Sequence, residues 1–331
     1  MHFHGKCSPQ ARQSLAAGAQ GGKGEFNMKR KVSLSIVGYQ ETVGDVRALE
    51  IAKEIGCDAV DFDLSSSRFD VANPASIYSK SEDEFLTYFD ALRQKAADLE
   101  LEIGQTHGRV TSYFNDPILD ENVFRNARLD CIATKALGAP VTVMHNVTTI
   151  ITGPEADPNR MREKSFEIFS RILPHARENG IILATETFGD ATGRNCCDFF
   201  GNILEFVKAY NRLTAAGFAD CFKICVDTGH SNKAMRFGNP TPADVIRILG
   251  GNTVVLHLND NDTLTDQHKT PLSGTIDWSD VFAALDEVAY AGNYNMELRL
   301  EHYGKNLMVE TGAFAVKLMK DILHERYGDG D

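Results

Sequence analysis

The sequence feature that most constrains the fold is a repeat of short apolar runs, rich in β-branched residues, that alternate with longer helical patterns. Each run is bounded by turn residues, which is typical of a buried strand. Strands that alternate regularly with helices indicate βα units around a parallel sheet. The eight predicted strands are residues 32–37, 58–63, 101–107, 140–145, 181–186, 222–227, 253–257 and 294–300.

Four of the intervening segments carry helix-end signals, which include a capping box, capping residues with or without a following proline, and in two of them a closing glycine. These are Ser81 with Glu84, Asp157–Pro158 closed by Asn179–Gly180, Thr241–Pro242, and Asp277 before a helix that we expect to end at Gly292.

Eight strand–helix pairs fit either a closed barrel or an open, doubly wound sheet. The open sheet would be favoured by a glycine-rich phosphate-binding fingerprint after the first strand, and residues 36–45, IVGYQETVGD, lack the G-x-G-x-x-G spacing. No composition shift divides the chain after Met28. We therefore predict an α/β fold, a single-domain (β/α)8 TIM barrel, over residues 28–331.

Residues 1–27 differ from the rest, because Gly, Ala, Gln and Ser dominate and no apolar periodicity is present. We interpret them as an added leader of irregular structure that precedes a native start at Met28. The segment has no apolar core of signal-peptide length, so a cytoplasmic protein is predicted. No run of 18 apolar residues occurs, and no membrane partner is expected.

The formal net charge is −12, and it becomes −14 without the leader, whose four charged residues sum to +2. Such a field repels nucleic acid overall, although it leaves room for a local basic channel. The charge therefore favours a small-molecule partner and makes a nucleic-acid partner less favourable.

Six metal-capable residues lie at or near the carboxyl ends of six consecutive predicted strands. They are His107, His145, Glu186, Asp227, His257 and Glu297, separated by 38, 41, 41, 30 and 40 residues. In a barrel, the carboxyl ends of all strands meet at one mouth, so these side chains are expected to share a single cavity. The alternative, six independent surface residues, is disfavoured by this shared phase.

Two glutamates, one aspartate and one histidine form an oxygen-rich ligand set. Glu186, Asp227, His257 and Glu297 suit one divalent ion, Mn²⁺, Mg²⁺, Co²⁺ or Zn²⁺, with positions left for substrate oxygens. Without an ion, the three carboxylates would repel one another and one would take up a proton.

The chain resembles the xylose-isomerase-like TIM-barrel superfamily, which includes sugar epimerases and isomerases of the tagatose 3-epimerase type and also endonuclease IV. The stretches that carry the resemblance are ATETFGD, CVDTGH, VVLHLNDND, DQHKTPLSGTIDW and NMELRLE, residues 184–190, 225–230, 254–262, 266–278 and 295–301. Carried over by position, Glu186, Asp227, His257 and Glu297 correspond to the metal ligands, and His230 to a substrate contact beside the ion.

The resemblance implies a metal-dependent isomerase or epimerase of a sugar or sugar phosphate. Glu186 and Glu297 would act as an acid/base pair on the two faces of one carbon, through an enediolate stabilised by the ion. Proton return to the opposite face gives epimerisation, and return to the neighbouring carbon gives aldose–ketose isomerisation. Homo-oligomers are an expectation by analogy with relatives alone.

A phosphodiesterase resembling endonuclease IV is the alternative, with more than one metal ion. Asp266 and His268 form a D-x-H motif after the seventh strand, which that enzyme uses in a trinuclear cluster, and they are additional candidate ligands or substrate contacts. His107 and His145 serve either as metal ligands there or as partners of sugar hydroxyls; a hydrogen-bonded core role is an equal alternative.

The two-residue period of a strand indicates two more candidate site residues near Glu297. Arg299 shares a predicted strand face with Glu297 and is a candidate contact for a substrate carboxylate or phosphate, with a rim salt bridge as the alternative. Glu301 is the substitute ligand if the strand extends two residues further. Asp277 and Trp278 are predicted to cap and pack a helix.

Overall fold

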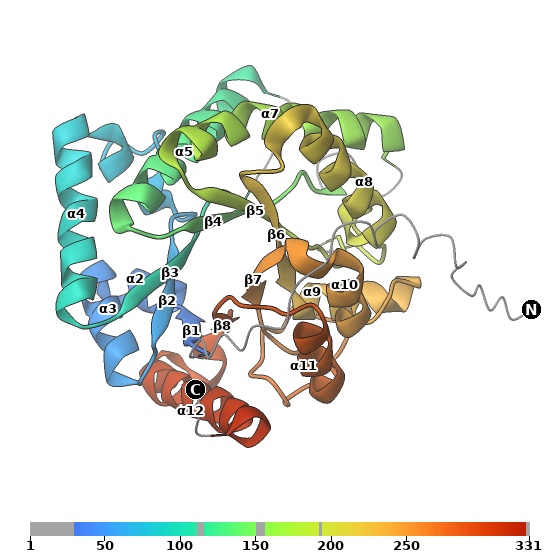
Figure 1. Ribbon diagram of the computed structural model, residues 1–331. Helices are drawn as coiled ribbons and strands as arrows, with labels where there is room; N and C mark the ends of the chain where they lie inside the picture. The colour runs from blue at the N-terminus through green and yellow to red at the C-terminus, as the bar shows by residue number, and fades with distance from the viewer. Residues whose placement is uncertain (1–29, 111–115, 150–155, 192–193, 329–331) are drawn as a thin grey trace, which may run out of the picture.

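The chain folds into a barrel of parallel strands with a ring of helices outside it (Figure 1). The computed structural model describes residues 30–110, 116–149, 156–191 and 194–328, so the predicted leader lies outside the described residues. The strands follow the order β7-β6-β5-β4-β3-β2-β1-β8. They are β1 (Val32–Ser35), β2 (Ala59–Asp63), β3 (Glu102–His107), β4 (Val141–Met144), β5 (Ile182–Glu186), β6 (Phe222–Asp227), β7 (Thr253–His257) and β8 (Tyr294–Met296).

The seam between β7 and β8 closes the barrel. Leu258 forms a parallel bridge with Met296. The Leu258 amide donates to the Asn295 carbonyl at 2.8 Å, and the Glu297 amide donates to the Leu258 carbonyl at 3.2 Å. The predicted (β/α)8 barrel is thereby confirmed.

The helices start where their capping residues predict. Ser81 and Glu84 form the expected capping box, and the side chains of Asp157 and Thr241 accept hydrogen bonds from the first-turn amides of their helices. The helices are α2 (Val37–Val43), α3 (Asp45–Glu54), α4 (Glu82–Asp98), α5 (Pro117–Leu137), α7 (Pro158–Asn179), α8 (Ile203–Leu213), α9 (Thr228–Ala234), α10 (Pro242–Leu249), α11 (Trp278–Glu287) and α12 (Met308–Tyr327). None of the described helices is both long and apolar enough to span a bilayer.

Three predicted boundaries are wrong. Strand β8 ends at Met296 rather than at residue 300, because the Arg299 amide donates to the His268 carbonyl at 3.1 Å and a 3₁₀ turn, Leu300–Tyr303, follows. Strand β1 ends at Ser35, since α2 begins two residues later. Helix α11 ends at Glu287, not Gly292, because Ala289 adopts a positive φ of 53° that stops the helix.

The barrel interior has an apolar part and a polar part. Val143, Ala184 and Cys225 pack with neighbouring valines into a small apolar cluster on β4–β7. On β8, β1, β2 and β3, the buried inward side chains are polar, and they include Asn295, Ser33, Asp61 and Gln105. The polar part therefore lies beneath the barrel mouth, where the metal-capable residues gather.

Candidate metal centre

The six strand-end residues do converge on one mouth. Glu186, Asp227, His257 and Glu297 each offer a ligand atom, and these atoms all lie within 4.8 Å of one another. Two further groups of metal-capable side chains satisfy the same limit and share residues with it: His107, His145 and Glu186, and His107, His257 and Glu297. Most of these residues line a cavity of about 630 Å³ that is open at the mouth.

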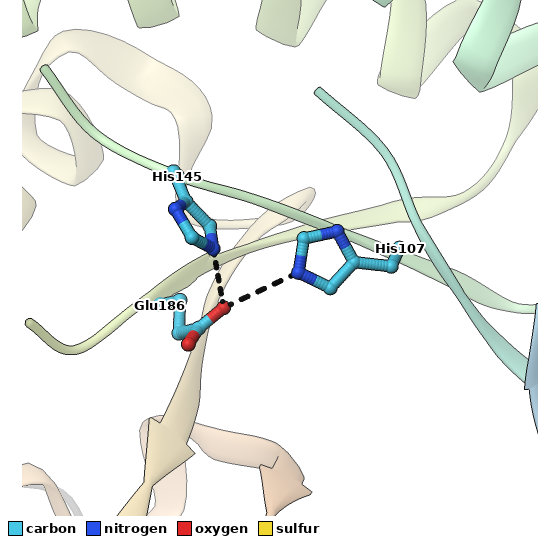
Figure 2. Close-up of side chains that lie close together, drawn as sticks. All are labelled: His107, His145 and Glu186. Atoms are coloured by element: carbon cyan, nitrogen blue, oxygen red, sulfur yellow. Dashed lines mark ion pairs between the residues drawn. The ribbon is translucent and has the colours of Figure 1, made fainter. Parts of the chain in front are cut away.

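Glu186 lies at the centre of the mouth and is fully buried. Its Oε2 lies 2.9 Å from His145 Nε2 and 3.6 Å from His107 Nε2, which reach it from the ends of β4 and β3 (Figure 2). Its Oε1 lies 3.0 Å from His230 Nδ1. Among the described residues, every ion-pair partner of this carboxylate is therefore an imidazole.

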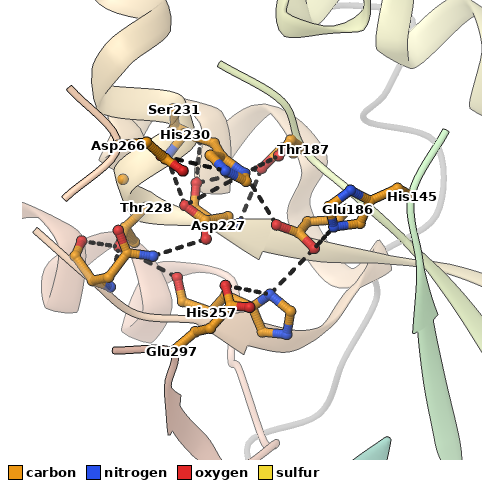
Figure 3. Close-up of polar contacts among 12 residues, drawn as sticks. His145, Glu186, Thr187, Asp227, Thr228, His230, Ser231, His257, Asp266 and Glu297 are labelled. Atoms are coloured by element: carbon orange, nitrogen blue, oxygen red, sulfur yellow. Dashed lines mark hydrogen bonds and ion pairs between the residues drawn. The ribbon is translucent and has the colours of Figure 1, made fainter. Parts of the chain in front are cut away.

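Asp227 has two tasks, which explain the CVDTGH stretch. Its Oδ1 accepts a hydrogen bond of 2.6 Å from the His230 amide and so caps α9. Its Oδ2 accepts from Asn259 Nδ2 at 2.8 Å. Figure 3 shows Asp227 beside His230 and Glu186. The approach of Asn259 to this turn requires glycine at position 229, because a Cβ there would lie 1.8 Å from Asn259 Oδ1.

His257 turns its Nδ1 toward the mouth. This atom lies 3.3 Å from Glu186 Oε2 and 3.3 Å from Glu297 Oε2. On the other side of the ring, Nε2 lies 3.3 Å from Asp61 Oδ2 and 3.1 Å from the side-chain nitrogen Nε2 of Gln105. An Nε2–H directed at Asp61 leaves the Nδ1 lone pair free for a cation, as in the carboxylate–histidine–metal arrangement.

Sequence reasoning missed Asp61, Gln105 and Asn259. All three are buried and contact predicted ligands from inside the barrel or from the loop after β7. The available signal was a charged or amide side chain at an inward position of a strand that is otherwise apolar, as Asp61 is in DAVDFD.

A separate group surrounds the D-x-H motif. His230, Asp266 and His268 offer ligand atoms within 4.8 Å of one another. His268 Nε2 lies 3.2 Å from Asp266 Oδ2, and its Nδ1 lies 3.1 Å from the Glu297 carbonyl oxygen. This group shares the cavity with Glu186 and Glu297.

The charges at the mouth are strongly coupled. Burial would raise the pKa of Glu186, but His145 and His257 outweigh it and hold that pKa well below its usual range. Burial would also lower the pKa of His107, yet Glu186 and Glu297 raise it to about 9. For Asp227, burial is the main effect and the pKa is raised. The pKa values of His230 and His257 are also raised, so without an ion these imidazoles and that of His107 favour the charged form that balances the carboxylates.

The donor set fits a divalent cation. Both oxygens of Glu186 and Nδ1 of His257 are buried and make no hydrogen bond within the described residues. Orphaned buried acceptors are costly unless another partner satisfies them. Three carboxylates and one neutral imidazole supply the oxygen-rich coordination that Mn²⁺, Mg²⁺, Co²⁺ or Zn²⁺ accept.

The structure confirms the rim salt bridge that was the alternative for Arg299, and the strand face predicted for Arg299 and Glu301 is wrong. Because β8 stops at Met296, neither continues a strand face with Glu297. The Arg299 side chain is 50% exposed, and its Nη2 lies 3.5 Å from Asp266 Oδ2, so it forms a rim ion pair. Glu301 is exposed in the 3₁₀ turn, although both line the outer cavity. Asp277 caps α11, and Trp278, the first residue of that helix, is buried, as predicted.

Comparisons with known proteins agree with the fold. A family model described as xylose isomerase-like TIM barrel matches residues 49–315. An uncharacterized protein of Sinorhizobium fredii, y4fM, is 27% identical over 177 residues, which are 53% of this chain and 52% of that protein. The chain thus matches about half the length of this curated relative.

Solved structures with the same barrel include three that cover nearly the whole chain. The IolI protein with a bound zinc atom has a TM-score of 0.66 at 16% identity and covers 89% of this chain and 98% of its own. A D-tagatose 3-epimerase-like protein scores 0.64 at 20% identity, covering 89% and 97%. A D-psicose 3-epimerase solved with D-fructose scores 0.64 at 15%, covering 88% and 99%. These likenesses establish the fold.

Proposed function

This chain belongs to the xylose isomerase-like TIM-barrel family, and from that premise we propose that it is a divalent-metal-dependent isomerase or epimerase of a sugar or sugar phosphate. The observation that carries the proposal is the cluster of Glu186, Asp227, His257 and Glu297, whose ligand atoms lie within 4.8 Å of one another beside a cavity of about 630 Å³. Cavities of this size accommodate small molecules. The epimerases among the solved neighbours support the sugar class.

The four residues would hold the ion, which when bound supplies a Lewis acid that makes a carbon-bound proton next to a carbonyl more acidic. Glu186 has a lowered pKa and is a weak base by itself. It can remove such a proton only where the substrate is acidified in this way. The proposal therefore needs both the carboxylate and the ion.

Glu186 and Glu297 reach the mouth from β5 and from the end of β8, which lie three strands apart around the barrel. We assign one as the base that removes the proton and the other as the acid that returns it. The imidazoles of His107, His145 and His230 surround Glu186 and would orient hydroxyl groups of the substrate (Figures 2 and 3).

The test is proton exchange. Chelator-treated protein is supplied with Mn²⁺ or Zn²⁺ and incubated with a panel of ketoses and ketose phosphates in deuterated water. The proposal predicts carbon-bound deuterium in at least one sugar, dependent on the added metal. No exchange with any sugar would argue against it. Deuterium at the original carbon with inverted configuration identifies an epimerase, and transfer to the neighbouring carbon identifies an isomerase.

A second candidate function is a multinuclear metal phosphodiesterase. It is favoured by the two groups beside the main cluster, His107 with His145 and Glu186, and His230 with Asp266 and His268. The net charge of the whole chain, −12, opposes a nucleic-acid substrate. Cleavage of an oligonucleotide with an abasic site, with three ions per chain, would support this candidate and exclude the first.

A further inference from the structure

A buried lysine lies beside one of the four metal-capable groups, the one formed by His230, Asp266 and His268. Lys233 lies in α9, one helical turn after His230, and only 5% of it is exposed. Its Nζ lies 3.2 Å from Asp266 Oδ1 and 2.6 Å from Asp190 Oδ1. Buried lysines are rare unless they are paired, so this ammonium is held in place by the two carboxylates.

The charge around Asp266 is already balanced. Asp266 faces the Lys233 ammonium through Oδ1 and the Arg299 guanidinium, at 3.5 Å, through Oδ2. Asp190 faces Lys233 and also Arg236, at 2.7 Å. Two carboxylates thus meet three permanent cations before any metal ion is considered.

The cluster around Glu186 is the opposite case. Among the described residues, no lysine or arginine forms an ion pair with Glu186, Asp227 or Glu297, whose ion-pair partners are all imidazoles. Three carboxylates without a fixed cation attract a divalent ion, whereas an ammonium 3.2 Å from the single carboxylate of the other group repels one. Burial keeps solvent and salt from screening that repulsion.

We propose that Lys233 acts as the fixed cation of the group formed by His230, Asp266 and His268, so that this group takes no divalent ion. Asp266 then orients His230, whose Nε2 lies 3.6 Å from Asp266 Oδ1, toward the cavity as a substrate contact. Lys233 is thereby a positioning residue that limits how many ions the mouth holds. The inference rests on the proposed metal-binding function of the Glu186 cluster.

The experiment counts Zn²⁺ ions bound per chain, by calorimetric titration of chelator-treated protein and by elemental analysis after dialysis. Lys233→Met removes the ammonium and keeps the length of the side chain, and Lys233→Arg is the matched control. We expect Lys233→Met to bind one Zn²⁺ more than wild type and Lys233→Arg to match wild type. The extra site should disappear in Lys233→Met combined with His268→Ala. Equal stoichiometry in wild type and Lys233→Met would overturn the proposal.

Wild-type crystals soaked in Zn²⁺ give a test that needs no variant. Anomalous density is expected between Glu186, Asp227, His257 and Glu297 and not between His230, Asp266 and His268. Density at the second position would overturn the role of Lys233. Glu186→Gln separates the two proposals: loss of all Zn²⁺ binding in that variant supports the main cluster, and retained binding there contradicts the proposed function itself.

Discussion

The acidic residues at the two ends of the barrel have different partners. At the amino end, the Asp58 carboxylate accepts from Lys320 Nζ at 3.1 Å and from the Val32 amide at 3.0 Å, and Glu102 pairs with Lys31. At the mouth, the ion-pair partners of Glu186, Asp227 and Glu297 among the described residues are all imidazoles. The first set is balanced by the protein itself, and the second is balanced by protons or by a metal ion.

The difference separates charges that the protein balances by itself from charges that we propose take part in chemistry. Half-exposed pairs such as Asp58–Lys320 contribute at most about 1 kcal/mol each and need nothing added. Buried carboxylates without a lysine or arginine partner depend on a proton or a metal ion for charge balance, and such groups are frequent in active sites. Four predictions follow from this contrast.

Replacing Glu186 with glutamine should have the largest effect. Because Gln has the same shape but neither takes up a proton nor carries a charge, metal-dependent deuterium exchange into the substrate should fall by about 10³-fold. Glu287→Gln is the matched control, since Glu287 pairs with Arg247 on the outside of the barrel at 2.8 Å and should keep full exchange. Unchanged exchange in Glu186→Gln would remove it from the acid/base pair.

Metal addition should stabilise the folded chain by binding at the barrel mouth and at no other site. At a free Mn²⁺ concentration 100 times its Kd, the free energy of unfolding should rise by about 2.7 kcal/mol, because only the folded chain has the site. Thermal unfolding with and without EDTA measures the rise. Asp227→Asn should abolish it, whereas Asp58→Asn at the opposite end should retain it. An equal rise in Asp227→Asn would place the ion elsewhere.

Asp61→Asn should weaken metal binding without removing a ligand. The carboxylate near His257 Nε2 fixes the ring so that Nδ1 faces the mouth, and loss of such partners weakens metal affinity by about 10- to 100-fold. Competition with a fluorescent chelator measures the affinity. Asp61→Glu should restore part of it, and Asp58→Asn should leave it unchanged. Wild-type affinity in Asp61→Asn would show that Asp61 has no orienting role.

The smallest effect expected is a pH dependence of the metal-free protein. Carboxylates raise the pKa of His107 and His268 to about 9 against the opposing effect of burial. A raised folded-state pKa stabilises the fold fully below the unfolded value of about 6.5, and the stabilisation is lost as pH rises through 9. The melting temperature in EDTA should therefore fall between pH 6.5 and 9.5. A rise over that range would contradict the charge balance described.

Residue patterns predict which metal-capable side chains meet at the mouth, because the strand ends of a parallel barrel lie together. Four strands end at the predicted residue, namely His107, Glu186, Asp227 and His257. The regular spacing of strand ends along the chain was therefore sufficient to bring these four residues together in the prediction. The predicted strand face for Arg299 was wrong because β8 ends early. That end depends on a backbone hydrogen bond from Arg299 to His268, a contact between segments that lie far apart in the sequence.

Contacts that depend on barrel geometry were not predictable. Asp61 approaches His257 across the barrel interior, and Lys233 approaches Asp266 from a helix that follows a different strand. Neither pair has a characteristic spacing in the sequence. Both contacts follow from the three-dimensional arrangement of the strands and helices, which the sequence pattern does not give.

The most direct measurement of the central claim is a pulsed EPR spectrum of chelator-treated protein that has been loaded with one equivalent of Mn²⁺. An ion held by Glu186, Asp227, His257 and Glu297 should show nitrogen coupling to a single imidazole, and this coupling should vanish in His257→Gln. Coupling to two imidazoles, or coupling that survives in His257→Gln, would place the ion at His107 and His145 or elsewhere and would contradict the account.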